Sequence, residues 1–418
     1  MTVEPFPTIP TTSSLRRNDF LFALIFYYFS LWIVVYAVDF GYDYVTLHRE
    51  HPDSATRTDT LSCYANWDGR WYERIATEGY MYHPEQMSSV AFFPLYPLLA
   101  WFVTLTGLPA RWALLLVSHF AMSGSCYFFL RYIRIRFQNE TPKNFATLRK
   151  FSTTALVVFP ATFYFRMAYT ESLFLLLLIS TLYSIQLKRS PLLIALLIGL
   201  ATATRPVGVA LVPIFLWHLW DRATSRSVFF VDVLFYGFVS ISGLLAYMLF
   251  LGLSFGNPVA FSQTQVHWAM RHDINTIYEK LRFCVTFEPV WSNFDPRSPV
   301  YWNQKQFGSL EWLNPRILNV FYFLLFVGLY VYGCVKKWLS RDEVVLCFFL
   351  FLIPYLLQGP SQMLTSHMRY IGVVFPVYLV IGRILANVDR VISGLCIGIM
   401  MLLLFLYTAL FASWYWLY

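Results

Sequence analysis

The segment Phe20–Val38 reads FLFALIFYYFSLWIVVYAV, nineteen consecutive residues without a charged side chain. At about 1.5 Å per residue, a helix of this length crosses roughly 30 Å of hydrocarbon, so the segment predicts a membrane span. Arg16 and Arg17 precede it directly. Because basic residues collect on the cytoplasmic side of membranes, these two arginines place the start of the span inside and the residues after Val38 outside.

The composition of the whole chain agrees with this prediction. Of 418 residues, 58% are hydrophobic and 13% are charged, against about 45–50% and about 25% in soluble globular proteins. These values argue against a soluble enzyme, a disordered protein and a nucleic-acid binder, and they predict an all-α polytopic membrane protein. The net charge of +8 is therefore interpreted as topology information and not as a nucleic-acid footprint.

Apolar stretches recur along the chain and predict about eleven transmembrane helices in a single domain covering residues 1–418. Clusters of Lys and Arg alternate with them and set their directions. The stretch Phe92–Gly107 is shorter and contains Pro94 and Pro97, so it predicts a juxtamembrane or partly inserted helix. The ten spans predicted after the first are residues 112–130, 152–165, 171–187, 191–204, 207–220, 228–254, 317–335, 344–358, 370–382 and 391–411.

Two polar segments, residues 39–91 and 255–316, are predicted to lie outside the membrane on the same side. Cys63 and Cys284 fall in these two segments, which leaves open a disulfide between them. The second segment is the candidate acceptor-side region. The closing residues Trp414, Tyr415, Trp416 and Tyr418 have the composition of an interfacial aromatic belt.

The first external segment contains the richest cluster of polar and aromatic residues, Asn66–Tyr80, which reads NWDGRWYERIATEGY. It predicts an amphipathic helix that begins at Gly69 or Arg70 and lies on the membrane. On that helix the apolar side chains Trp67, Trp71 and Ile75 share one face, which we expect to lie in lipid. Arg70 and Arg74 share another face, which we expect to line a wet cavity.

Asp68 has two interpretations at this stage. In the first it only caps the helix, and Arg70 pairs with Glu73 or Glu78. In the second it is a general base at the membrane surface that takes a proton from an acceptor hydroxyl, while Arg70 and Arg74 hold a phosphate.

Three further segments place charged residues at predicted span ends on the outer side. Glu171 opens a span, where it either complements the helix dipole or serves function, because inserting a carboxylate in hydrocarbon costs roughly 2.5–3.5 kcal/mol. Arg205 lies between two apolar half-spans and before Pro206. His367 and Arg369 lie at the outer mouth of a span, where they either grip a lipid phosphate or anchor the interface. We find no paired carboxylates or Cys and His spacing typical of a metal site, and we expect neither metal nor cofactor.

Several of these residues resemble one known family. Trp67-Asp68 followed by Tyr72, the run Ala91–Leu98 (AFFPLYPL), Tyr169–Phe174 (YTESLF) and Thr204–Gly208 (TRPVG) are similar, in this order, to blocks of the PIG-V-like mannosyltransferases. These enzymes transfer the second mannose in GPI-anchor synthesis, and the group includes prokaryotic relatives. The resemblance covers about the first half of the chain.

The resemblance implies an integral membrane glycosyltransferase of the GT-C class. Such an enzyme has a helical bundle with juxtamembrane helices in the first external loop, and it takes a sugar from a polyprenyl- or dolichyl-phosphate donor on the non-cytoplasmic face. Here the sugar would be mannose, the acceptor a lipid or glycan, the reaction inverting, and Asp68 the catalytic base. The candidate catalytic residues are Asp68 and Glu171. The candidate substrate-binding residues are Trp67, Arg70, Tyr72, Arg74, Arg205, His367 and Arg369.

Two alternatives stay open from the sequence. A multi-span lipid or solute transporter, or flippase, would also contain Pro-broken helices, although here the polar residues gather on one side and not at mid-membrane. A non-catalytic subunit of a glycosylation complex would keep the hydropathy without needing Asp68, Arg70, Arg74 and Glu171 together. The expected location is a prokaryotic plasma membrane, with the endoplasmic reticulum membrane as the alternative.

Overall fold

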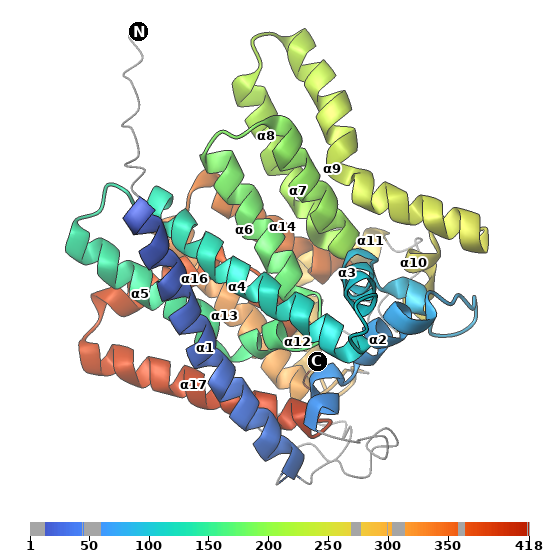
Figure 1. The fold of residues 1–418 in the computed structure, drawn as a ribbon, viewed down its shortest axis with the longest axis horizontal. Helices are drawn as coiled ribbons and strands as arrows, with labels where there is room; N and C mark the ends of the chain where they lie inside the picture. The colour runs from blue at the N-terminus through green and yellow to red at the C-terminus, as the bar shows by residue number, and fades with distance from the viewer. Residues whose placement is uncertain are drawn as a thin grey trace.

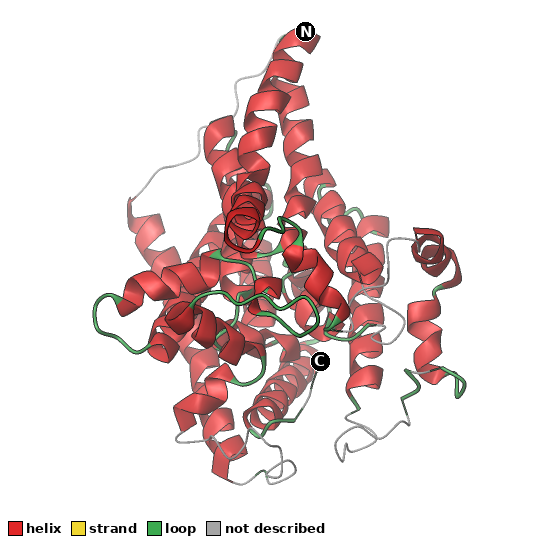
Figure 2. Cartoon of the chain, turned by 90° about the vertical axis from the view of Figure 1, so that its right-hand side faces the viewer, coloured by secondary structure: helices red, strands yellow, loops and turns green. Residues whose placement is uncertain are grey.

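The computed structural model describes residues 13–43, 45, 60–268, 277–298, 300–302, 314–357, 364–415 and 417. Within these ranges every regular element is a helix, as Figure 2 shows. Parts of the two predicted external segments, residues 46–59, 269–276 and 303–313, lie outside the described residues, as do Trp416 and Tyr418 of the predicted aromatic belt.

The helices follow the predicted spans closely in most of the chain. The longer ones are α1 (Ser13–Asp43), α4 (Ala110–Arg136), α5 (Pro142–Val158), α6 (Glu171–Gln186), α7 (Pro191–Thr204), α8 (Val212–Arg222), α9 (Arg226–Phe255), α13 (Pro315–Val335), α14 (Arg341–Leu357), α16 (Pro376–Asn387) and α17 (Arg390–Ala412). The α-helices α2 (Asp68–Glu78), α3 (Leu95–Thr104), α10 (Ala260–Gln263), α11 (Ile277–Thr286), α12 (Glu288–Trp291) and α15 (His367–Gly372) are shorter. Short 3-10 helices are η2 (Thr60–Ala65), η3 (Ser89–Ala91), η4 (Pro160–Arg166), η5 (Pro206–Leu211), η6 (Thr264–Val266) and η8 (Ser292–Phe294).

Five of the described helices are long and apolar enough to cross a membrane: α1 from Phe20, α4, α9, α13 and α17. A sixth candidate is the pair η4 and α6, which is bent by 100° at a short break. Helices α3, α7 and α16 are apolar but shorter. The ten residues of α3 span only about 15 Å, which agrees with a partly inserted helix at Phe92–Gly107. The full count of eleven crossings stays a prediction.

The long helices pack into one bundle. Helix α1 lies along α17, α4 along α6, α5 along α16, and α7 along α9 (Figure 1). The contact between α7 and α9 is close because small residues meet there: a Cβ added to Gly243 would lie 2.0 Å from the carbonyl oxygen of Gly199. Such small-residue contacts are typical of helix pairs in membranes.

The charged residues that the sequence places inside meet each other at one end of the bundle. Glu343, which is fully buried at the start of α14, accepts hydrogen bonds from Tyr132 (2.7 Å) and Arg136 (3.1 Å) at the end of α4. Glu140 pairs with Arg383 of α16 at 2.5 Å. The structure thus joins three predicted cytoplasmic segments, which supports their common side.

Corrections to the sequence-based expectations arise where buried protein contacts replace lipid or solvent. Cys63 and Cys284 are both free thiols, so the disulfide that the sequence left open is not formed. Trp414 and Tyr415 are 2% and 1% exposed, so they are core residues and not part of an interfacial belt. The outer loop also begins later than predicted, because α1 continues through Asp39 to Asp43.

Candidate active site

The first element of the candidate site is α2, whose first residue is Asp68. The N-cap position belongs to Trp67, which has a φ of +57° and makes no side-chain capping hydrogen bond. A φ in this range is uncommon for a large side chain and is held here by packing of the Trp67 ring on Trp414, with ring centroids 5.3 Å apart. Asp68 is therefore not the N-cap residue, and its carboxylate faces another partner.

The apolar face of α2 packs on protein and not on lipid, which corrects the sequence-based prediction. Trp71 stacks on Phe92, with centroids 5.9 Å apart, and its edge meets Trp268 at 5.1 Å. Tyr72 and Ile75 are 4% and 7% exposed. The helical spacing of apolar residues predicts which face of a helix is buried, but it does not show whether lipid or protein covers that face.

The second element is the break between η4 and α6. Residues Met167–Thr170 are buried as they cross this break, and α6 then begins at Glu171, which is 0% exposed. The amide of Ala168 donates to the carbonyl of Tyr64 at 2.9 Å, and the Tyr169 hydroxyl donates to the carbonyl of Asn66 at 3.0 Å. These contacts fix the broken span against the segment that carries Asp68.

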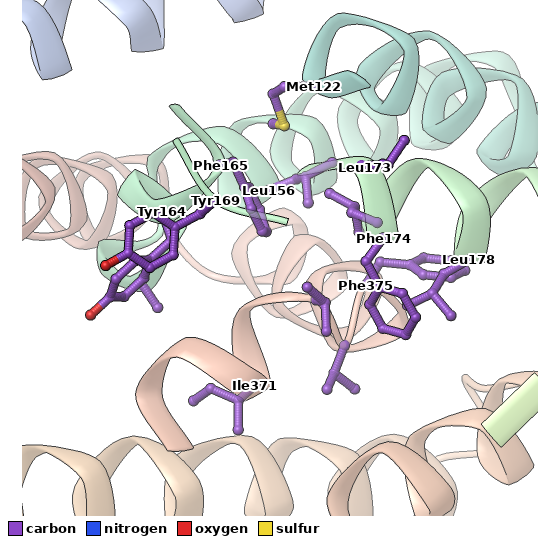
Figure 3. Close-up of a cluster of buried hydrophobic side chains, with 14 of the residues drawn as sticks. Met122, Leu156, Tyr164, Phe165, Tyr169, Leu173, Phe174, Leu178, Ile371 and Phe375 are labelled. Atoms are coloured by element: carbon purple, nitrogen blue, oxygen red, sulfur yellow. The ribbon is translucent and has the colours of Figure 1, made fainter. Parts of the chain in front are cut away.

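Apolar and aromatic side chains enclose the break. Figure 3 shows Phe165, Leu173 and Phe174 directed into a cluster with residues such as Phe375, whereas the rings of Tyr164 and Tyr169 lie together with their hydroxyl oxygens pointing away from it. The two tyrosine rings have centroids 5.5 Å apart. Irregular backbone at membrane depth is tolerated where protein satisfies and encloses it, as here.

Two arginines reach Glu171 from distant parts of the chain. Arg205 lies between α7 and η5, and its Nη1 donates to Glu171 Oε1 at 2.6 Å. Arg369, on α15, donates from Nε to the same oxygen and from Nη1 to Asp68 Oδ2. The result is a continuous chain of charges, Asp68–Arg369–Glu171–Arg205, with alternating sign.

The four charged side chains differ sharply in their exposure to solvent. The side chains of Glu171 and Arg369 are 0% and 6% exposed, that of Arg205 13%, and that of Asp68 20%. Asp68 is therefore the accessible end. The second oxygen of Glu171, Oε2, is buried without a hydrogen-bond partner among the described residues. An unsatisfied buried acceptor is costly, so this oxygen is a candidate position for a substrate hydroxyl.

Aromatic rings line the charges. The guanidinium of Arg369 lies 4.6 Å from the ring centroid of Tyr169, and that of Arg205 lies 5.2 Å from the ring of Tyr370. Tyr72 packs against Phe92 and Tyr96, and its burial raises the pKa of its hydroxyl well above the usual value, so the hydroxyl stays neutral. Planar guanidinium groups held over rings keep their remaining N–H donors free for an anion.

The structure gathers only some of the predicted substrate-binding residues. Arg74 is half exposed and pairs with Glu78 at 2.9 Å, away from the charge chain. The guanidinium of Arg70 lies 4.4 Å from the ring centroid of Trp414, while Glu73 pairs with Arg111 at 3.1 Å and Glu78 pairs with Arg74.

His367 is buried and packs with its ring against Phe323 of α13, at 5.2 Å between centroids, and against Tyr370. It therefore belongs to the packing of α15 against α13, whereas Arg369, two residues later, reaches the charge chain. About half a turn of helix thus separates a packing residue from a site residue, although the sequence placed them together.

Residues that the sequence did not single out complete the site. Tyr169 supplies the ring under Arg369, and Asn66 donates to the carbonyl of Phe411 at 3.0 Å, which joins the end of α17 to α2. Trp414 covers both Trp67 and Arg70. No local pattern marks these contacts, because each joins positions far apart in the chain.

Comparisons with known proteins were made on sequence and on fold. Residues 53–255 match the family described as mannosyltransferase (PIG-V). This region contains Asp68, Glu171 and Arg205, whereas Arg369 lies outside it. No curated protein sequence matches the chain.

Similar solved structures include the oligosaccharyltransferase of Archaeoglobus fulgidus. Its apo form has a TM-score of 0.44 at 12% identity, over 92% of this chain and 56% of that one. The same enzyme in complex with an inhibitory peptide and a dolichol-phosphate has a TM-score of 0.38 at 11% identity, over 94% of this chain and 56% of that one. The chain thus spans about half the length of these proteins.

Proposed function

We propose that this chain, whose residues 53–255 match the mannosyltransferase (PIG-V) family, is a glycosyltransferase that transfers mannose from a polyprenyl- or dolichyl-phosphate donor to a lipid or glycan acceptor. The reaction would occur at the non-cytoplasmic face of the membrane. A prokaryotic plasma membrane is the expected compartment, and the endoplasmic reticulum membrane is the alternative.

The observation that carries the proposal is the chain of charges in which the partly accessible carboxylate of Asp68 pairs with Arg369, which Glu171 links in turn to Arg205. In the proposed reaction Asp68 takes the proton of an acceptor hydroxyl, whose oxygen attacks C1 of the sugar. The bond from C1 to the phosphate oxygen breaks, and the lipid phosphate leaves with the electron pair. Inversion at C1 converts a β-linked phosphate to an α-glycoside.

Each remaining member of the cluster has a role that its position supports. Arg369 and Arg205 bind the departing phosphate, because guanidinium groups suit phosphate oxygens and stabilise developing negative charge. Glu171 holds both arginines through Oε1, and its buried Oε2 accepts a hydroxyl of the sugar. This arrangement supplies a base, an anion site and orientation, which are the main requirements when the leaving group is already a phosphate.

The second polar segment is proposed to shape the acceptor side. The part of it that is described packs on the first: Trp268 meets Trp71 and Phe92 at 5.1 and 5.4 Å, and His267 Nε2 lies 2.7 Å from the carbonyl oxygen of Pro84. A surface made by both segments beside α2 would bring the acceptor hydroxyl toward Asp68.

The test is incubation of the purified chain with polyprenyl-phosphate-mannose and an extract of membrane lipids. Transfer releases free polyprenyl phosphate and labels an acceptor with mannose. A transporter or flippase would instead move the donor across proteoliposomes with its sugar still attached. Intact donor at the end of a long incubation, together with transbilayer movement, would reject the proposal in favour of transport.

A further inference from the structure

We infer that Arg369 changes partners during the reaction: in the free enzyme it pairs with Asp68, and the phosphate of the donor displaces Asp68 from it. This inference rests on the proposed function and adds a sequence of events to it. Donor binding would release the carboxylate of Asp68 at the moment when a leaving group is in place.

The geometry of Arg369 supports this exchange. Its guanidinium uses Nε for Glu171 and Nη1 for Asp68, so the two carboxylates occupy different edges of one planar group. Glu171 is fully buried and is also fixed by Arg205, whereas the Asp68 side chain is 20% exposed. A phosphate entering from the accessible end would therefore compete with Asp68 and leave the contact with Glu171 intact.

Packing would keep Arg369 in place after the exchange. Its guanidinium lies over the ring of Tyr169, and its backbone is part of α15, which packs on α13 and on η4. The arginine therefore needs no large movement to change partners. Asp68, at the first residue of α2, needs only a side-chain rotation to turn toward an acceptor.

The balance of charge explains why the exchange would favour catalysis. Asp68 and Glu171 carry two negative charges, and Arg205 and Arg369 carry two positive charges, so the free site is neutral. A phosphodiester adds one negative charge, which is expensive in a poorly hydrated site. When the phosphate leaves it gains a second negative charge, and uptake of the acceptor proton by Asp68 offsets that charge, so the excess does not grow during transfer. Without donor, the ion pair with Arg369 keeps the carboxylate of Asp68 from accepting a proton from an acceptor.

The experiment measures binding and does not depend on transfer. Undecaprenyl phosphate is titrated into wild type, Asp68→Asn, Arg369→Gln and the double variant in detergent micelles, and affinity is followed by native mass spectrometry. Removal of the competing carboxylate should tighten binding by about five- to 100-fold, the range typical of coupled sites. In the Arg369→Gln background the same Asp68→Asn change should have no effect.

Two controls isolate the phosphate and the specific pairing. Undecaprenol, which lacks the phosphate, should show no tightening of comparable size. Glu73 lies on the same helix as Asp68 but pairs with Arg111. Glu73→Gln should therefore leave the affinity for undecaprenyl phosphate unchanged. Arg369→Met, which keeps the length of the side chain without its charge, replaces Arg369→Gln if the latter fails to fold.

The inference is overturned if Asp68→Asn binds undecaprenyl phosphate no more tightly than wild type. It is also overturned if the tightening persists without Arg369, since the effect would then be long-range repulsion alone. Absence of transfer in an enzyme that shows the coupling would instead reject the proposed function and leave the exchange standing.

Discussion

Asp68 and Arg369 form an ion pair although 301 positions separate them in the chain. The pair joins the first residue of α2 to α15, and through Glu171 it reaches the break in the η4–α6 span. Glycosyl transfer by this chain is therefore expected to depend on residues from both halves of the sequence, and the following predictions separate their roles.

Glu171→Gln should impair both stability and donor binding. It removes the carboxylate that two arginines share, and breaking a buried ion pair typically costs about 3–5 kcal/mol in the free energy of unfolding. Thermal unfolding in detergent measures the first effect, and the KM for donor measures the second.

The matched control for that prediction is Glu343→Gln at the opposite end of the bundle. Glu343 is equally buried and pairs with Arg136. Its loss should lower stability similarly and leave the KM for donor unchanged. Equal effects of both variants on the KM would mean that Glu171 acts only through stability.

Arg205→Ala should raise the KM for donor by roughly 10–100-fold, which corresponds to loss of one charge-assisted hydrogen bond of about 1.5–3 kcal/mol. Arg74→Ala should change the KM little, because Arg74 is exposed and pairs with Glu78. Initial rates measured at a series of donor concentrations give the KM of each variant. A larger effect at Arg74 would restore the sequence-based assignment of that residue to phosphate binding.

Local patterns in the sequence predicted much of the fold. The uncharged run at Phe20–Val38 became α1, and the helix after Trp67 became α2 with its buried face at the expected spacing. Both results follow from periodicity and length, which depend on neighbouring residues only.

Local patterns could not predict which of these elements contact each other. Arg369 was predicted to bind phosphate, but its pairing with Asp68 was not foreseen, and the covering of Trp67 by Trp414 turned a predicted lipid-facing surface into a protein contact. Hydropathy assigns a residue to an apolar environment, yet lipid and protein are equally apolar. Long-range pairing therefore has no local signal in a single sequence.

The topology predicts opposite accessibility for the two ends of the bundle. A cysteine at Glu78, which is exposed on α2, should react with an impermeant maleimide added outside intact cells or spheroplasts. A cysteine at Lys143, which is exposed at the start of α5, should react only after the membrane is opened. The background is a variant in which exposed Cys396 is replaced by Ser. Labelling of both positions from outside would contradict the assigned orientation.

The close contact of α7 and α9 predicts that Gly243→Ala destabilises the chain. The added Cβ would lie 2.0 Å from the Gly199 carbonyl oxygen and 2.6 Å from the Ala203 amide, both of which are backbone atoms that cannot move aside. Overpacking of this kind costs typically about 1–3 kcal/mol. Gly237→Ala on the same helix meets only Val233 at 3.9 Å and should be neutral in a thermal unfolding assay. A neutral Gly243→Ala would show that the two helices lie further apart.

The rate of mannose transfer by Asp68→Asn, measured at saturating polyprenyl-phosphate-mannose, tests the central proposal most directly. Loss of a general base should lower the rate by about 10²–10⁴-fold, with thermal stability retained and the donor bound at least as tightly as by wild type, while Glu78→Gln on the same helix stays fully active. Transfer at the wild-type rate by Asp68→Asn would contradict the assignment of Asp68 as the base.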